Sequence, residues 1–157
     1  MFRGVQSGRV DDKHRLKFPT LVHRRLLEVY GSGDVFITSA NKKDVLVFPV
    51  REWEAGEQKL GQSAGNEDPL DAMRKQKIAF QMQHHGTEQS LDSQGRVLIP
   101  AVLREAVGMR SEVMMVWQGN RIALVAAERY QQKLEEMELD AEDHALAARL
   151  GLSDGTF

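Results

Sequence analysis

Residues 10–19 read VDDKHRLKFP, and residues 91–100 read LDSQGRVLIP. The two stretches share three residue types at a constant offset of 81 positions. The matched pairs are Asp11 and Asp92, Arg15 and Arg96, and Pro19 and Pro100. This agreement of residue type, order and spacing indicates an internal repeat.

A similar run of elements follows each proline. Residues 20–31 and residues 101–109 both carry a short helical pattern. Two apolar segments, which predict strands, come after each pattern. They are Val35–Thr38 and Val45–Phe48 in the first copy, and Val113–Val116 and Ile122–Val125 in the second. We therefore expect one ββαββ unit used twice.

The second copy indicates its turn clearly. Asp92 suits the first position of a type I turn, where its carboxylate accepts backbone N–H groups, and Gly95 suits the fourth position. Arg96 then leaves the turn at the tip of a hairpin. Pro100 predicts the start of a helix at its first position, and Gly108 predicts the end of that helix.

The first copy departs from the second at one turn position, where His14 stands in place of Gly95. A left-handed backbone costs a residue with a side chain roughly 1–2 kcal/mol, and histidine tolerates it better than most. Two interpretations are open: a turn of slightly different shape, or the same turn with a cation that offsets the strain.

Length and composition exclude several classes of protein. The chain has 157 residues, 41% of them apolar and 28% charged, which is typical of a globular protein. The absence of Cys excludes disulfide scaffolds, thiol nucleophiles and Cys-ligated metals. No apolar run approaches the roughly 20 residues that span a bilayer. The N-terminal MFRGVQSGRV lacks the apolar centre of a secretory signal, so we expect a cytoplasmic protein without membrane partners.

The net charge of −2 is unevenly distributed along the chain. Residues 1–25 hold seven Lys or Arg against two Asp, a net charge of +5. Residues 128–157 hold three basic against eight acidic residues, a net charge of −5. A polyanion-binding surface explains the basic segment, and so does an ordinary solvated surface.

No motif predicts catalysis or a cofactor. The sequence has no GxSxG elbow, no P-loop and no dinucleotide-binding glycine pattern, so we expect no enzyme, no cofactor and no small-molecule substrate. The best candidate for metal chemistry is the pair His84 and His85. Adjacent residues on a strand point to opposite faces and seldom bind one ion, so we predict no metal site.

Helical patterns also occupy the remaining segments. Asp68 and Pro69 suit the N-cap and first position of a linker helix, whose cluster Arg74, Lys75 and Lys77 suits either exposed charge or phosphate contacts. In the acidic tail, an apolar stripe at helical spacing predicts a helix that packs on the body or on a neighbouring subunit. The stripe comprises Tyr130, Leu134, Met137, Ala141, Ala145, Ala148 and Leu152.

Several motifs together resemble the MraZ family of bacterial transcriptional regulators, which is associated with the division and cell-wall gene cluster and belongs to the AbrB-like superfamily. The motifs are FRG at Phe2–Gly4, DDKxRLxxP at Asp11–Pro19, the FP-then-EWE stretch at Phe48–Glu54, EQKL at Glu57–Leu60 and DxxGRxLIPxxLR at Asp92–Arg104. The chain departs from the family pattern at His14 and Trp117, where a glycine is usual, and at His23, where an arginine is common.

The resemblance implies an α+β fold that is mainly β. Two tandem AbrB-like swapped-hairpin repeats would form one small β-barrel, with linker helices and a C-terminal helix added. We expect the first repeat at residues 3–53, a helical linker at 54–83, the second repeat at 84–130, and an acidic helix and tail at 131–157.

The resemblance further implies a sequence-specific regulator that binds repeated promoter boxes in double-stranded DNA as a ring-shaped homo-oligomer, associated with the nucleoid. The implied DNA-binding residues are Lys13, His14, Arg15, Lys17, Arg24, Arg25 and Arg96. The turn-forming residues are Asp11, Asp92, Gly95, Pro19 and Pro100. The alternative is a structural or protein-interaction ring of the same fold without specific DNA binding.

Overall fold

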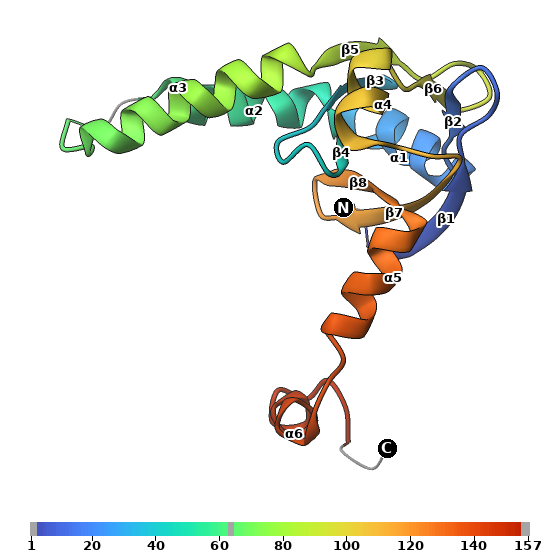
Figure 1. The fold of residues 1–157 in the computed structure, drawn as a ribbon, viewed down its shortest axis with the longest axis vertical. Coiled ribbons are helices and arrows are strands. Elements are labelled where there is room, and N and C mark those ends of the chain that lie inside the picture. Colours follow the sequence, from blue (N-terminus) through green and yellow to red (C-terminus); the bar gives the residue numbers. More distant parts are fainter. Residues whose placement is uncertain (1–2, 63–64, 155–157) are drawn as a thin grey trace. The chain divides into compact units, whose positions relative to one another are not determined.

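The computed structural model of the chain describes residues 3–62 and 65–154. The chain splits into two compact units, Met1–Ala127 and Glu128–Phe157. Figure 1 shows the elements. In chain order they are β1 (Val5–Arg9), β2 (Arg15–Lys17), α1 (Thr20–Tyr30), β3 (Asp34–Thr38), β4 (Val45–Pro49), α2 (Val50–Gly61), α3 (Pro69–His84), β5 (Thr87–Ser90), β6 (Arg96–Leu98), α4 (Ala101–Val107), β7 (Glu112–Gln118), β8 (Arg121–Ala126), α5 (Ala127–Glu136) and α6 (Ala141–Arg149). The expected ββαββ unit is present twice.

The strands of the two repeats are exchanged. A six-stranded antiparallel sheet has the order β1-β7-β8-β4-β3-β5, and β2 pairs with β6 in a separate two-stranded ribbon. The first strand of each repeat pairs with a strand of the other repeat: β1 with β7, and β5 with β3. This arrangement confirms the small AbrB-like β-barrel built from both repeats.

Both repeats supply the core of the barrel. Leu16 and Ile37 from the first repeat and Ile99, Leu103 and Leu124 from the second are completely buried. In the β2–β6 ribbon, alternate residues face the core, as the period of a strand requires. The second repeat therefore cannot keep its apolar face buried without the first.

The helices that follow each ribbon strand begin and end in the same way. Gly31 after α1 and Gly108 after α4 adopt left-handed conformations, with φ of 76° and 62°. The prediction that Pro100 is the first helical residue is wrong by one position. Pro100 is the N-cap with an extended backbone, and its carbonyl accepts the first helical bonds from Leu103 and Arg104, both at 3.0 Å.

Helices α2 and α3 lie side by side and form a hairpin that extends from the barrel (Figure 1). Its base is a small apolar cluster in which Trp53 stacks on Phe36 with ring centroids 4.3 Å apart, beside Met82. At the other end, Asp68 caps α3 by accepting the N–H of Leu70 at 2.9 Å. The predicted capping of this linker helix is confirmed.

The expectation that His84 and His85 lie on a strand, which led to the prediction of no metal site, is wrong. His84 is the last residue of α3, and His85 is its C-cap, so the linker helix runs into the start of the expected second repeat. His85 is buried, its Nδ1 lies 2.8 Å from the carbonyl oxygen of Gln81, and its ring meets that of His84 edge to face. These contacts assign His85 a packing role between the end of α3 and the start of β5.

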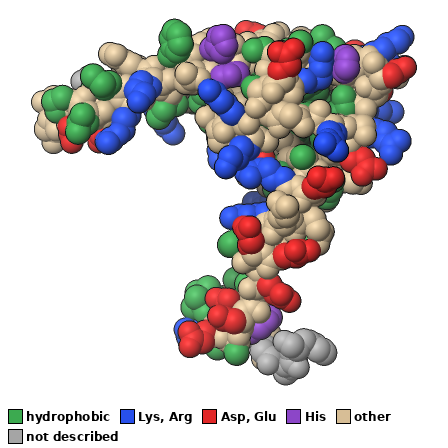
Figure 2. Space-filling view, viewed as in Figure 1, with side chains coloured by type: hydrophobic (Ala, Val, Ile, Leu, Met, Phe, Trp, Pro, Cys, Tyr) green, Lys and Arg blue, Asp and Glu red, His purple; other side chains and the backbone are tan. Residues whose placement is uncertain are grey.

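The acidic segment contains two helices where one was predicted. The apolar stripe is interrupted after α5 because Asp140 forms a capping box with Asp143 that starts α6 anew. Leu134, Met137 and Leu152 are more than half exposed. In Figure 2 acidic side chains cover much of the visible face of these helices. Within residues 3–62 and 65–154, no helix is long and apolar enough to cross a membrane.

Candidate nucleic-acid interface

The first turn is organised by the carboxylate of Asp11. Its Oδ1 accepts the backbone N–H groups of Lys13 and Arg15, both at 2.9 Å. Its Oδ2 accepts the Nε–H of Arg15 at 3.1 Å. The Asp11 carbonyl accepts the N–H of His14 at 2.9 Å, which closes the turn. One aspartate therefore fixes both the backbone and the direction of the Arg15 side chain.

The second turn repeats this network with Asp92. Its Oδ1 accepts the backbone N–H groups of Gln94 and Arg96, both at 2.9 Å, and its Oδ2 accepts the Nε–H of Arg96 at 2.8 Å. Gly95 donates its N–H to the Asp92 carbonyl at 2.9 Å. The predicted positions in this turn, with the aspartate first and the glycine fourth, are confirmed by that closing hydrogen bond.

These hydrogen bonds favour the ionised carboxylates. The backbone N–H of Arg96, ahead of the Arg96 side chain and the N–H of Gln94, lowers the pKa of Asp92 to about 2. The same groups at Arg15 and Lys13 lower the pKa of Asp11. Each carboxylate stays charged at neutral pH and holds its arginine.

His14 has the left-handed backbone that its position demands. Its φ is 63°, and that of Gly95 is 76°. The interpretation that the first turn has a different shape is therefore wrong. The chain keeps the turn and accepts a non-glycine residue in it.

The two turns are tied to each other across the β2–β6 ribbon. Phe18 donates its N–H to the Gly95 carbonyl at 2.9 Å, and Ile99 donates its N–H to the His14 carbonyl at 2.8 Å. His23, on α1 of the first repeat, also lies beside the second turn, since a Cβ added to Gly95 would come 3.9 Å from the His23 Cβ. Each turn thus closes against the other repeat.

The outer face of the ribbon, formed by Arg15, Lys17, Arg96 and Leu98, brings three of the predicted DNA-binding residues together. Arg15 lies opposite Leu98, and Lys17 lies opposite Arg96. The alternate residues, Leu16 and Val97, are buried. Arg15 and Arg96 are therefore diagonal neighbours, with Cα atoms about 7–8 Å apart in this register.

Both arginines have their outer nitrogens available. Arg15 and Arg96 each donate the Nε–H to their aspartate. Within the described residues, the Nη atoms of both arginines have no hydrogen-bond partner. About a third or less of each side chain is exposed, 32% for Arg15 and 27% for Arg96. A guanidinium anchored through Nε presents its two Nη groups in a fixed direction.

The remaining predicted residues are distributed over other elements. Lys13 and His14 lie in the first turn, next to the ribbon's outer face. Arg24 and Arg25 are on α1: Arg24 pairs with Glu28 at 3.8 Å and is largely exposed, whereas Arg25 borders a cavity between α1 and β1. Figure 2 shows basic side chains interspersed with acidic ones where β1 and β2 lie.

Leu98 belongs to the outer face but was not among the predicted binding residues. It is 48% exposed, and its backbone N–H and carbonyl are both held by the Gln89 side chain, at 3.0 and 2.7 Å. The sequence could have shown that Leu98 lies on the outer face, because neighbouring residues of a strand point to opposite faces and Val97 is apolar. A leucine on a charged face is nevertheless easily read as incidental.

The described residues contain no group of three or more His, Asp or Glu side chains that would hold a metal ion. The interactions of the ribbon are hydrogen bonds and ion pairs between basic and acidic groups, arranged on an exposed face. This chemistry suits contacts with a large anion.

Known proteins resemble the chain over nearly its whole length. The family model described as "MraZ protein, putative antitoxin-like" matches residues 82–150. A protein named transcriptional regulator MraZ from Acidobacterium capsulatum is 38% identical over 97% of this chain and 100% of its own length. Those from Koribacter versatilis and Escherichia coli O127:H6 are 32% and 34% identical, over 97% and 92% of this chain and 100% and 91% of theirs. The chain therefore belongs to the MraZ family.

Proposed function

We propose that this chain is a sequence-specific DNA-binding transcriptional regulator, and that the β2–β6 ribbon reads the DNA. The observation that carries the proposal is the outer face itself, on which two arginines from different repeats are each anchored by an aspartate. The relatives' names, which describe transcriptional regulators and not enzymes, support the same class.

A two-stranded ribbon has the dimensions that the major groove of B-DNA admits. There Arg15 and Arg96 would each contact a guanine through both Nη groups, a pairing worth roughly 1–3 kcal/mol of discrimination. Their separation of about 7–8 Å corresponds to about two base steps of 3.4 Å. Leu98, which lies opposite Arg15 and on the same strand as Arg96, suits the methyl group of a thymine.

Phosphate contacts would supply most of the affinity. Lys13, His14 and Lys17 flank Arg15, and Arg24 and Arg25 add charge on α1. The first copy therefore carries more positive charge than the second, in which Gln94 and Leu98 replace Lys13 and Lys17. These contacts position the protein on the duplex without reading its sequence.

One ribbon of this size would bind weakly, so assembly is part of the proposal. A ring-shaped homo-oligomer that offers several ribbons to repeated promoter boxes gains about 10²–10⁴ in avidity without new contacts. We place the protein in the cytoplasm, on the nucleoid, where such boxes are found.

The test is binding of the full chain to a duplex that covers the region upstream of its own gene. Specific binding should survive an excess of scrambled duplex, and a two-box duplex should bind more tightly than a one-box duplex. If scrambled DNA competes equally, the chain is a ring-forming or protein-interaction member of the fold and not a reader of sequence.

A further inference from the structure

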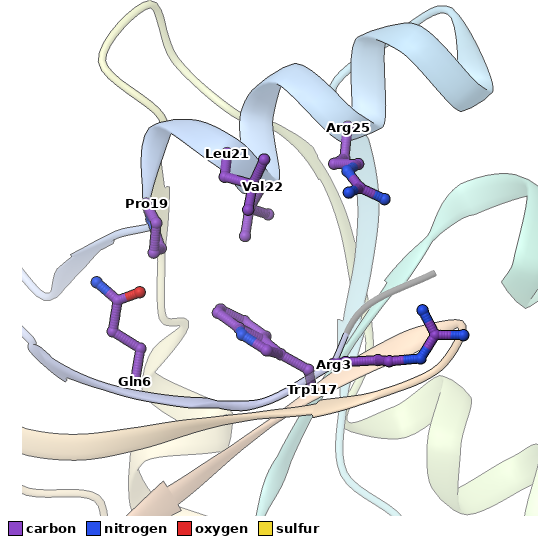
Figure 3. A pocket seen from close by; sticks show the side chains of 7 residues that line it. All are labelled: Arg3, Gln6, Pro19, Leu21, Val22, Arg25 and Trp117. Carbon is purple, nitrogen blue, oxygen red and sulfur yellow. The ribbon is translucent and has the colours of Figure 1, made fainter.

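A cavity of about 190 Å³ opens between α1 and the paired strands β1 and β7. Figure 3 shows its lining: the guanidinium groups of Arg3 and Arg25 lie at one end, the Gln6 amide lies at the other, and the Trp117 ring lies between them. Leu21 on α1 faces the ring across the cavity. The DNA-reading ribbon contributes none of these residues.

The aromatic wall is held by the backbone of the N-terminal segment. Trp117 donates its backbone N–H to the Gly4 carbonyl at 2.8 Å. Gly4 has a φ of 95°, and a Cβ added there would come 3.3 Å from the Trp117 ring. The indole therefore lies directly against a glycine backbone, which fixes the ring as one side of the cavity.

The basic end of the cavity has unbalanced charge. Among the described residues, neither Arg3 nor Arg25 is paired with a carboxylate, and the lining contains no acidic side chain. Both arginines are exposed, so this end of the cavity presents positive charge to an anion from solvent. Guanidinium matches phosphate especially well because it donates two parallel hydrogen bonds.

The other groups suit a flat ring with polar edges. Trp117 and the aliphatic Leu21 supply apolar surface on which a heteroaromatic ring can stack, and the Gln6 amide can both donate to and accept from the edge of such a ring. The volume is below the roughly 300 Å³ at which ligands are fully enclosed, so a single nucleotide would lie partly outside the cavity.

We propose that this cavity binds a nucleoside monophosphate unit, with its phosphate at Arg3 and Arg25 and its base on Trp117. The unit has two sources, a free mononucleotide or an unpaired nucleotide of a nucleic-acid strand. The site goes beyond the proposed reading of duplex DNA. The two share only Arg25, through which a bound nucleotide would compete with duplex phosphates.

The test is calorimetric titration of the full chain with adenosine monophosphate, adenosine, inorganic phosphate and an oligothymidylate single strand. Saturable binding of adenosine monophosphate, tighter than that of adenosine or phosphate alone, is expected. Trp117→Leu should weaken it about 5- to 150-fold, the range for loss of one base stack. A single strand that binds through Trp117 when free nucleotide does not would identify nucleic acid as the source.

Arg24 provides the matched control for Arg25, because it is adjacent on α1 but pairs with Glu28 outside the cavity. Arg25→Gln and Arg3→Gln should weaken nucleotide binding at least about tenfold, while Arg24→Gln leaves it unchanged. Equal losses at Arg24 and Arg25, an acidic peptide that binds as tightly as the nucleotide, or no binding that depends on Trp117 would overturn the proposal. None of these outcomes concerns competition by scrambled duplex, so the two proposals fail separately.

Discussion

The turns at Asp11–Arg15 and Asp92–Arg96 have the same hydrogen bonds but different charge. In both, an aspartate accepts two backbone N–H groups and the Nε–H of an arginine, and the fourth residue has a positive φ. The first turn and its strand carry Lys13, His14 and Lys17, where the second has Gln94, Gly95 and Leu98.

The comparison separates what builds the interface from what strengthens it. The aspartate and arginine suffice to form either turn, because the network is complete in the second copy without any further charge. Lys13 and His14 take part in that network only through their backbone N–H groups, so the side-chain charges added in the first copy have no part in it. We therefore assign them to ligand binding and expect the two copies to differ in affinity more than in geometry.

The largest effect is expected from Arg15→Ala, which should abolish binding to the cognate duplex. Loss of one bidentate guanine contact reduces affinity about 5- to 150-fold, and the loss repeats in every subunit of an assembly. Folding and assembly should persist because the side chain faces outward. Competition binding measures the loss of DNA binding. Circular dichroism and size-exclusion chromatography check that the variant still folds and assembles. Cognate binding at parental concentration would exclude Arg15 as a reader.

Arg96→Ala should weaken cognate binding less than Arg15→Ala does. The second turn has no counterparts of the cations Lys13 and His14, so Arg96 is supported by fewer neighbouring phosphate contacts than Arg15. The same competition assay compares the two variants directly. Equal losses would mean that both turns meet the DNA symmetrically, which would break the distinction drawn between them.

Lys17→Gln should weaken cognate and scrambled duplexes alike. A phosphate contact carries no sequence information, and removing one charge should make the slope of log K against log salt shallower by about 0.9. Lys43→Gln, an exposed lysine in the loop between β3 and β4, is the matched control and should leave the slope unchanged. A loss confined to the cognate duplex would instead assign Lys17 to base reading.

Acid should remove the stabilisation that the ionised Asp92 carboxylate gives to the fold. Hydrogen bonds from the backbone and side chain of Arg96 lower the pKa of Asp92 to about 2, so its contribution to stability is present above pH 3.8 and lost as the pH falls toward 2. Asp92→Asn removes that titration. Between about pH 5 and pH 2 the thermal midpoint of this variant should fall less than that of the parent. Parallel curves would show that Asp92 has no linkage to folding.

Local chemistry explains why the repeats were predictable from the sequence. Asp92, Gly95 and Gly108 each occupy a position that only a few residue types suit, so their spacing predicted a turn and a helix end. The exchange of strands between repeats is non-local, and only the family resemblance indicated it. Pro100 was placed one residue too far into the helix because an N-cap and a first position both accept proline.

The structure of the acidic tail differs from its prediction because an apolar stripe at helical spacing fits either one helix or two. The apolar stripe of the tail continues across Asp140, but the capping box of that residue starts a new helix. The cavity at Trp117 combines residues from β1, α1 and β7, and no motif links such distant positions. Residues 63 and 64, within the helical linker expected at 54–83, lie outside the described residues.

The smallest effect, and the closest comparison of the two turns, is expected from His14→Gly, which gives the first turn the residue of the second. Relief of the left-handed strain and the greater freedom of an unfolded glycine nearly cancel, so stability should change by about 0–1 kcal/mol in favour of the variant. Binding to DNA should tighten in the parent as the pH falls from about 8 to about 6, because histidine gains its charge in this range. The variant should bind about two- to fivefold more weakly than the parent at about pH 6, the size of one exposed ion pair, and should show a flatter pH profile. The parent and the variant share four other histidines, so the variant must be compared with the parent at each pH. If the variant keeps the full pH dependence of the parent, His14 is a tolerated substitution and the first turn binds through Lys13, Arg15 and Lys17 only.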